Sequence, residues 1–211
     1  MKSAKKVALG VIATALLGMG SFSQLAYGAD LVTNGSFEAN IQGNNSWNIY
    51  TGLTGWTGLP NIELRNNVAG TAYDGVNFVE MDTNSNSAMK QTLTGAAGLY
   101  QLSFWYSARP NTGPTNNLTF TFDGSAPLTV LNSVSNGSSS HNWQNYTALV
   151  NFDGSGDLYF SATGTSDSYG GSLDKISFTT AVPEPETYAM MLAGLGLMGL
   201  VARRRRSKIV S

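Results

Sequence analysis

Hydrophobic residues follow two different patterns along this chain, and each pattern predicts a different kind of segment. Continuous apolar stretches lie near the two ends, whereas apolar and polar residues alternate in short runs between Asp30 and Thr180. Alternation with a period of two puts successive side chains on opposite faces of the backbone and is typical of half-buried β-strands. The clearest predicted strands are Tyr100–Tyr106, Leu118–Phe122, Ala148–Phe152 and Leu158–Ala162.

The alternating segments predict a single all-β domain over residues 29–181. Turn-forming pairs separate the runs, among them Asp123-Gly124, Asn136-Gly137 and Asp153-Gly154; these residue types tolerate left-handed backbone angles. About 150 residues suffice for eight or more strands around a two-layer core. We therefore expect an antiparallel β-sandwich of the jelly-roll type, with irregular loops over residues 40–58 and 132–142.

The N-terminal residues 1–28 have the layout of a secretory signal. Lys2, Lys5 and Lys6 precede the apolar stretch Val7–Met19, and small residues follow at Ala26-Tyr27-Gly28. This order predicts an exported chain that is cleaved before Ala29. Thirteen helical residues span about 20 Å, too short to cross a bilayer comfortably. A buried amphipathic helix is the alternative, but the stretch is apolar on all faces.

The C-terminal residues form a three-part tail. The segment Val182-Pro183-Glu184-Pro185 comes first, the apolar stretch Tyr188–Ala202 follows, and the tail then reaches Arg203, Arg204, Arg205 and Arg206. The prolines predict an extended, accessible segment before a short transmembrane helix. Because arginine clusters stay in the cytoplasm, the body is expected on the other side of the inner membrane.

This tail, over residues 182–207, resembles the PEP-CTERM sorting signal. The resemblance implies a Gram-negative bacterium that makes exopolysaccharide, and an exosortase that processes the chain near Pro183–Pro185. The protein would be anchored transiently in the inner membrane, and would then reach the cell surface or the extracellular matrix. An ordinary C-terminal membrane anchor is the alternative reading of the same pattern.

The charge distribution excludes some partners of the body. The net charge of −1 hides a separation, because only Arg65, Lys90, Arg109 and Lys175 remain between Ala29 and Val182, against eleven carboxylates. Such an acidic body disfavours nucleic acid, which requires a basic footprint. The chain has no cysteine, so disulfides and thiolate chemistry are excluded.

Several short motifs in the body occur in an order that resembles a known family. They are Asn34–Glu38, Ala72–Gly75, Phe78–Asp82, Gly98–Phe104 and Leu173–Phe178. This order is similar to that of galactose-binding-like jelly rolls, in particular DUF642-type and carbohydrate-binding-module-like domains of bacterial surface proteins. In such modules a structural calcium ion often ties the first strand to the last. The matching positions here are Glu38 and Asp174, for which ordinary surface charge is the alternative.

Candidate catalytic residues are few. His141 is the only histidine and lies in a polar Ser/Asn segment, where we expect a solvated loop residue; no Gly-x-Ser-x-Gly motif supplies a nucleophile for a serine triad. Glu80 and Asp82 share one face of a predicted strand, about 7 Å apart. Their spacing fits a glycosidase pair, but such carboxylates more often face solvent or bind a metal.

Aromatic side chains point to sugar binding, because a ring can stack on the apolar face of a sugar while polar groups bind its hydroxyls. Trp47 and Tyr50 fall in the predicted loop 40–58, and Arg109 and Asn111 at the end of a strand are expected to line the same rim. The other tryptophans are expected in the core, with an exposed sheet face as the alternative for Trp105.

Taken together, these features predict an exported, exosortase-processed surface or matrix protein. Its non-catalytic β-sandwich would associate with exopolysaccharide. A structural or adhesive matrix protein without a sugar site is the main alternative, and a glycan-active enzyme is disfavoured by the lack of a motif.

Overall fold

The computed structural model describes residues 28–113, 115–123, 129–131, 138–181, 192 and 194–198. The expected signal segment lies almost entirely outside the described residues, as do the processing signal Val182–Pro185 and the topology signal Arg203–Arg206. Residues 192 and 194–198 are helical. In the described part of the chain, no helix has both the length and the apolar character needed to cross a membrane.

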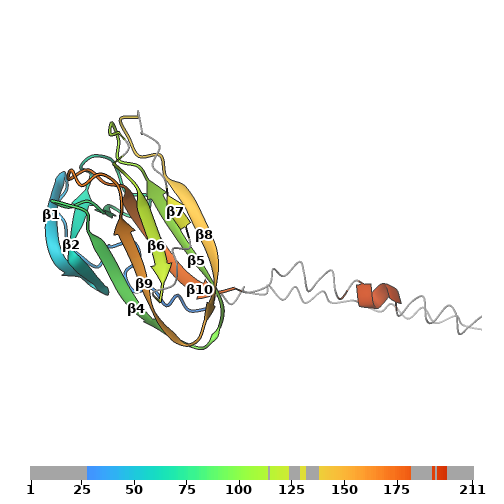
Figure 1. Cartoon of the computed structure of the whole chain (residues 1–211). Helices are drawn as coiled ribbons and strands as arrows, with labels where there is room; N and C mark the ends of the chain where they lie inside the picture. The colour runs from blue at the N-terminus through green and yellow to red at the C-terminus, as the bar shows by residue number, and fades with distance from the viewer. Residues whose placement is uncertain are drawn as a thin grey trace, which may run out of the picture.

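Residues 28–181 form an all-β, antiparallel sandwich, as the alternating pattern predicts (Figure 1). All the strand pairs are antiparallel. The strands are β1 (Ser46–Leu53), β2 (Trp56–Asn66), β3 (Asn77–Glu80), β4 (Ala88–Thr94), β5 (Gly98–Ser107), β6 (Leu118–Phe122), β7 (Thr129–Leu131), β8 (Gln144–Phe152), β9 (Ser155–Ala162) and β10 (Ser172–Thr180).

One continuous sheet, curled on itself, makes both layers of the sandwich. The strand order is β7-β6-β9-β4-β2-β3-β10-β5-β8, and β1 pairs with β2 beside this path. The long strand β2 joins the layers, because its first part, Thr57–Leu59, pairs with β4 and its second part, Glu63–Asn66, pairs with β3. The two halves of the sheet can therefore face each other across one core.

The core is built from the inward-facing residues of the alternating strands. In β6, Leu118, Phe120 and Phe122 are buried while the intervening threonines are partly exposed. Phe120 lies among the rings of Phe104 and Phe160, with centroid distances of 5.1 and 6.2 Å. Tilted and edge-to-face ring pairs of this kind stabilise a core beyond the area they bury.

The prediction of a loop over residues 40–58 is wrong. This segment contains all of β1 and the start of β2, paired in register from Ser46↔Asn66 onward. The hydrophobic pattern did not show β1, because this strand lies beside the main path of the sheet and buries only Leu53 fully. In the described part of the second predicted loop, residues 138–142 are irregular, as expected.

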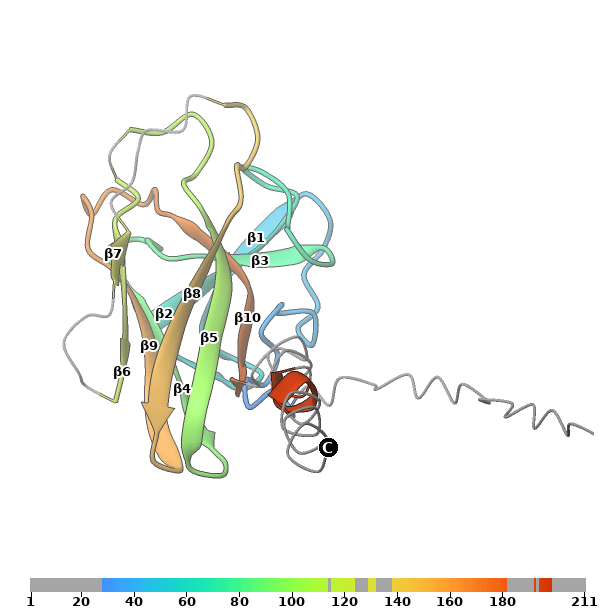
Figure 2. The same cartoon turned by 90° about the vertical axis from the view of Figure 1, so that its right-hand side faces the viewer.

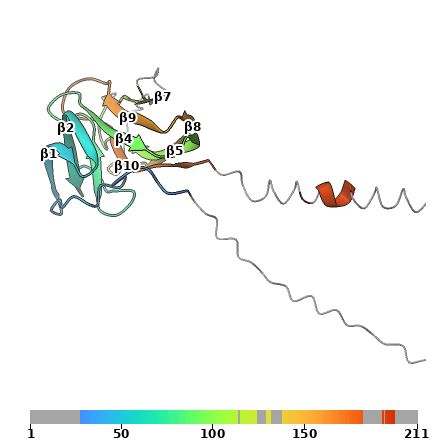
Figure 3. The same cartoon turned by 90° about the horizontal axis from the view of Figure 1, so that it is seen from below.

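The two ends of the body lie next to each other. The amide of Leu31 donates to the carbonyl of Phe178 at 3.0 Å, and the Asp30 carboxylate accepts the amide of Phe178 at 2.8 Å. Figure 3 shows both termini leaving the body on the same side. The described residues of the β5–β6 loop, residues 138–143 before β8 and the β9–β10 loop lie at the opposite end of the sandwich (Figure 2).

Candidate functional site

A pocket of about 530 Å³ opens between loops at the end of the sandwich opposite the termini. The β5–β6 loop supplies most of its lining, and the β2–β3, β7–β8 and β9–β10 loops complete it. The lining residues are Ala69, Arg109, Pro110, Asn111, Thr112, Gly113, Thr115, Ser139, Asp167 and Tyr169. Two of the residues predicted for the rim, Arg109 and Asn111, therefore lie together in one pocket. Asp167 and Tyr169 lie with them, and the sequence pattern did not single them out.

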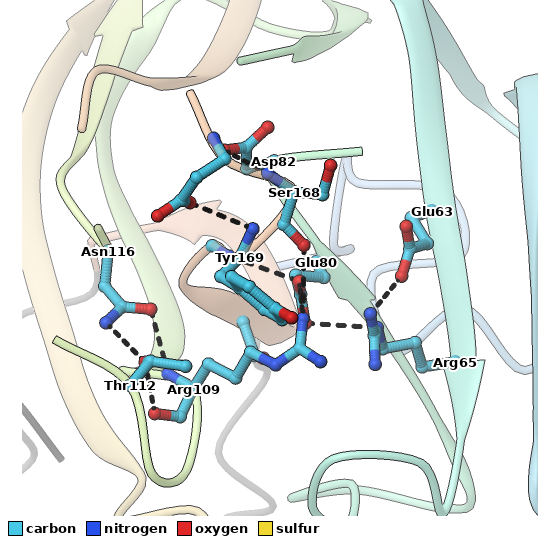
Figure 4. Close-up of polar contacts among 12 residues, drawn as sticks. Glu63, Arg65, Glu80, Asp82, Arg109, Thr112, Asn116, Ser168 and Tyr169 are labelled. Atoms are coloured by element: carbon cyan, nitrogen blue, oxygen red, sulfur yellow. Dashed lines mark hydrogen bonds and ion pairs between the residues drawn. The ribbon is translucent and has the colours of Figure 1, made fainter. Parts of the chain in front are cut away.

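The Arg109 guanidinium is fixed on the wall of the pocket. Its Nη1 donates to Glu80 Oε1 at 2.7 Å and to the carbonyl of Ser168 at 3.2 Å (Figure 4). Its Cζ lies 4.3 Å from the centroid of the Tyr169 ring. Within the described residues, Nε and Nη2 carry no hydrogen bond. The side chain is thus held by one nitrogen and by a ring, and two nitrogens stay available as donors.

A buried ion-pair network lies beneath this arginine. Arg65 pairs with Glu63 and, through Nε, with Glu80 Oε2 at 3.1 Å, so Glu80 bridges two guanidinium groups (Figure 4). The side chain of Glu80 is completely buried. Its burial raises its pKa to about 7, although both arginines act in the opposite direction. Charges buried in this way need fixed partners, so the network holds Arg109 in one orientation.

Two buried carboxylates fix the β9–β10 loop that carries Asp167 and Tyr169. Asp82 Oδ2 accepts the amides of Asp167 and Ser168 at 2.9 and 3.2 Å, and Glu80 Oε1 accepts the amide of Gly170 at 3.2 Å. A Cβ atom at Gly170 would lie 2.5 Å from the Asp82 amide nitrogen, so only glycine allows this approach. Burial raises the pKa of Asp82.

Asn116 holds the other main loop of the pocket. Its side chain is fully buried. Its Oδ1 accepts the amide of Arg109 at 3.0 Å, and its Nδ2 donates to Thr112 Oγ1 at 3.1 Å and to the carbonyl of Gly113 at 3.0 Å. The buried Tyr106 hydroxyl donates to the Asn116 carbonyl. Asn116 therefore holds the β5–β6 loop from the inside, through Thr112 and Gly113, which also line the pocket.

The structure corrects the expectation for Glu80 and Asp82. Neither carboxylate faces solvent: both are fully buried, and Asp82 lies beyond the end of β3. The period-two argument assumed a solvated outer face. Loops cover the outer face of β3 instead, and Arg109 compensates one of the buried charges.

The expectation of a solvated His141 is also wrong. Its Nδ1 lies 2.8 Å from the carbonyl of Thr71, its Nε2 lies 3.0 Å from Ser172 Oγ, and its ring meets Phe78 edge-on at 4.8 Å. Burial lowers its pKa to about 4, so the neutral ring bridges two loops. Ser172 is fully buried, and Nδ1 faces a carbonyl where a serine triad needs a carboxylate.

Trp47 and Tyr50 lie on β1 and do not line the pocket. The Trp47 side chain is 48% exposed, with the Arg65 guanidinium 5.8 Å from its ring centroid. Tyr50 packs against the core, and its hydroxyl donates to Gln42 Oε1 at 3.1 Å.

The remaining tryptophans differ in burial. Trp56 is buried in the core, as expected. Trp105 lies on the outer face of β5, half-buried and stacked on Tyr73 with a centroid distance of 3.7 Å; this matches the alternative reading of its phase. Trp143 is only partly buried, and its indole nitrogen donates to the carbonyl of Thr71.

Glu38 and Asp174, the two predicted calcium ligands, both accept hydrogen bonds from backbone amides of residues 73–77, between β2 and the start of β3. Glu38 Oε1 accepts the amides of Val76 and Asn77 at 2.9 and 2.7 Å. Asp174 Oδ2 accepts those of Tyr73 and Asp74 at 2.7 and 2.9 Å, and its Oδ1 accepts the amide of Lys175. Calcium needs oxygen ligands that face the ion, whereas Glu38 Oε1 and both oxygens of Asp174 face N–H donors.

The two carboxylates therefore do not fit the calcium shell that the family resemblance implies. Over the described ranges, no group of three or more histidine, aspartate or glutamate side chains could hold a metal ion. The first and last parts of the body are instead tied through hydrogen bonds to the β2–β3 loop. Burial raises the pKa of Asp174 to about 7, although the amides that it accepts lower it.

The comparisons with known proteins identify the sorting motif in the tail. Residues 181–206 match the PEP-CTERM protein-sorting motif, which implies export, sorting to the cell surface and processing by an exosortase. A comparison with curated protein sequences gives no match.

Among solved structures, the body is similar to carbohydrate-binding modules. A native family 35 module from Clostridium thermocellum is 18% identical, with a TM-score of 0.44 over 64% of this chain and 99% of that one. A family 61 module in complex with β-1,4-galactotriose is 16% identical, with a TM-score of 0.45 over 71% and 97%. The K1 cleaved adhesin domain of Lys-gingipain from Porphyromonas gingivalis W83 is 14% identical, with a TM-score of 0.49 over 70% and 96%. The chain thus carries a PEP-CTERM sorting motif after an all-β, antiparallel body.

Proposed function

We propose that this protein is a non-catalytic, polysaccharide-binding protein of the cell surface or extracellular matrix, and that it binds sugar in the pocket around Arg109 and Tyr169. The observation that carries the proposal is the composition of this pocket. An exposed ring, Tyr169, lies beside donors and acceptors from Arg109, Asn111, Asp167 and Ser139. A pocket needs both elements for a sugar, since the ring stacks on C–H groups and the polar groups pair with hydroxyls.

The position of the pocket supports display toward a polymer. The sorting tail starts next to β10, at the end of the body where both termini leave it. The loops that carry the lining residues of the pocket lie at the opposite end (Figure 2). A chain held by its tail would therefore present the pocket away from its attachment point.

The same residues argue against glycoside hydrolysis. Hydrolysis requires two carboxyl groups on either side of the scissile bond. Among the described residues that line the pocket, Asp167 is the single carboxylate. Glu80 and Asp82 are buried and engaged with guanidinium and amide donors.

The affinity of such a site is expected to be weak. One stacking ring contributes about 1 kcal/mol beyond its buried area, so a few hydrogen bonds and one ring give dissociation constants of about 0.1–1 mM. Many copies along one polymer would raise the overall retention through avidity.

Retention of the exported protein by a panel of immobilised polysaccharides tests the proposal. We expect Tyr169→Ala to lose retention on any polymer that holds the wild type, with its melting temperature nearly unchanged. Tyr159→Ala is the matched control, because Tyr159 also lies beside a cation, Lys90 at 5.5 Å, but does not line the pocket. Equal retention of the wild type and Tyr169→Ala on every polymer would overturn the proposal.

A second candidate, an adhesive matrix protein that contacts other proteins, rests on strand β8. It is the last strand of the sheet, it carries no charged residue, and its Leu149 is 65% exposed. Edge strands usually carry charges that prevent pairing with other chains. Self-association that Leu149→Lys abolishes, together with no retention on any sugar, would favour this candidate.

A further inference from the structure

The four basic side chains of the body are all committed to carboxylates. Arg65 pairs with Glu63 and Glu80, and Arg109 pairs with Glu80. On the surface, Lys90 pairs with Asp157 at 2.8 Å and Lys175 with Asp74 at 3.9 Å. Since residues 29–181 contain four basic residues against eleven carboxylates, seven carboxylates remain beyond these pairs. An anionic polymer would thus meet an acidic body whose few cations are already neutralised.

The charge balance at the pocket itself is also negative. The charged groups in and directly beneath the pocket are two guanidinium groups, of Arg65 and Arg109, and four carboxylates, of Glu63, Glu80, Asp82 and Asp167. Four negative charges against two positive charges leave two excess negative charges. One of them, Asp167, is exposed on the lining and uses Oδ1 to accept the amide of Tyr169 at 3.2 Å.

The free edge of the Arg109 guanidinium, Nε and Nη2, has a geometry that would also fit a carboxylate. The negative charge around the Arg109 guanidinium disfavours a carboxylate ligand. Glu80 lies 2.7 Å from Nη1 and compensates the positive charge, and Asp167 lines the same pocket. A sugar hydroxyl, in contrast, can accept from the guanidinium and donate to a carboxylate at no cost in charge.

We propose that Arg109 and Asp167 select uncharged sugars that present neighbouring hydroxyls, and that the excess negative charge of the pocket excludes uronic acids. This inference rests on the proposed function of the same pocket. Arg109 donates to one hydroxyl, Asp167 accepts from the next, and the Tyr169 ring covers the C–H face. The polysaccharide that the protein recognises is then a neutral one, or a neutral stretch of a mixed polymer.

The test compares retention of the exported protein on pairs of polymers that differ in a carboxylate: galactan with polygalacturonate, and mannan with polymannuronate. Measurements at pH 8 keep Glu80 ionised, since its pKa is about 7. We expect the neutral member of at least one pair to bind better by about threefold or more, the factor given by two like charges about 7 Å apart in water. The preference should shrink in 0.5 M salt.

Asp167→Asn is the informative variant, because it removes the pocket charge but keeps an acceptor oxygen. It should narrow the preference for the neutral polymer. Asp153→Asn removes the same charge from the exposed turn between β8 and β9, at the other end of the sandwich (Figure 2), and should leave the preference unchanged.

Three results would overturn the inference. Equal or better retention on the uronate polymers refutes the selectivity and leaves the proposed function standing. An equal effect of Asp153→Asn and Asp167→Asn assigns the preference to the overall charge of the body. Retention on none of the four polymers, and on no other polysaccharide of the panel, removes the proposed sugar site and the selectivity with it.

Discussion

Replacing Asn116 by alanine should both destabilise the body and disable the pocket. The fully buried side chain makes hydrogen bonds with the amide of Arg109, the Thr112 hydroxyl and the carbonyl of Gly113. Each such bond contributes about 1 kcal/mol, and each buried partner left without a bond adds a desolvation cost. For three bonds the free energy of unfolding should fall by about 3 kcal/mol.

In a domain of this size, about 3 kcal/mol corresponds to a decrease of about 6–12 °C in melting temperature. Thermal unfolding followed by circular dichroism measures it, with Asn151→Ala as the control, since Asn151 is exposed on β8. The β5–β6 loop should also lose its shape, so polysaccharide retention at 10 °C, where the variant is folded, should fall. A melting temperature within about 2 °C of the wild type would refute the assignment of Asn116 as the residue that holds this loop.

Three further predictions concern other parts of the body. In the folded protein, Asp174 and Glu80 bind a proton more tightly than in the unfolded chain, because their pKa values are about 7 against usual values near 4. His141 binds its proton more weakly in the folded protein, where its pKa is about 4. The two carboxylates stabilise the folded protein at low pH more than His141 destabilises it, so the melting temperature should rise as the pH falls from 7.5 to 5. This rise should be larger in His141→Gln, and a decrease in melting temperature would contradict these pKa shifts. Trp47→Ala should cost about 0.5–1 kcal/mol, as for an exposed cation–π pair, and should leave polysaccharide retention intact; lost retention would return Trp47 to the sugar site. EDTA should leave the melting temperature unchanged, because amides occupy Glu38 Oε1 and both oxygens of Asp174. A decrease that calcium reverses would restore the calcium hypothesis.

The strands that form the core could be predicted from the sequence, and strand β1 could not. Leu118–Phe122 alternates cleanly and forms β6 over the same five residues, because one of its faces meets the core and the other does not. Strand β1 buries only Leu53 fully, so its stability depends on pairing with β2 and leaves no periodic trace in the sequence.

Half of the residues predicted for the rim lie in the pocket, whereas Trp47 and Tyr50 lie on β1, and the buried residues beneath the pocket were not predicted. Arg109 and Asn111 were expected from their place after a long strand, and both line the pocket. Glu80 looked like a surface carboxylate because its three ion-pair and loop partners come from distant parts of the chain. The one available signal for Tyr169 was an aromatic residue in a loop of glycine, serine and aspartate, where no strand pattern would bury it.

An NMR titration of the exported protein with short neutral oligomers of galactose, mannose and glucose tests where the protein binds sugar. Perturbation of amide signals would locate the contact on the sandwich. We expect saturable shifts for residues 109–113, 139 and 167–169 with at least one oligomer and a dissociation constant of about 0.1–1 mM. These shifts should be lost in Tyr169→Ala. Saturable shifts confined to β1 around Trp47 or to the outer faces of β5 and β8, or no shifts at all with any of the oligomers, would contradict the proposed site.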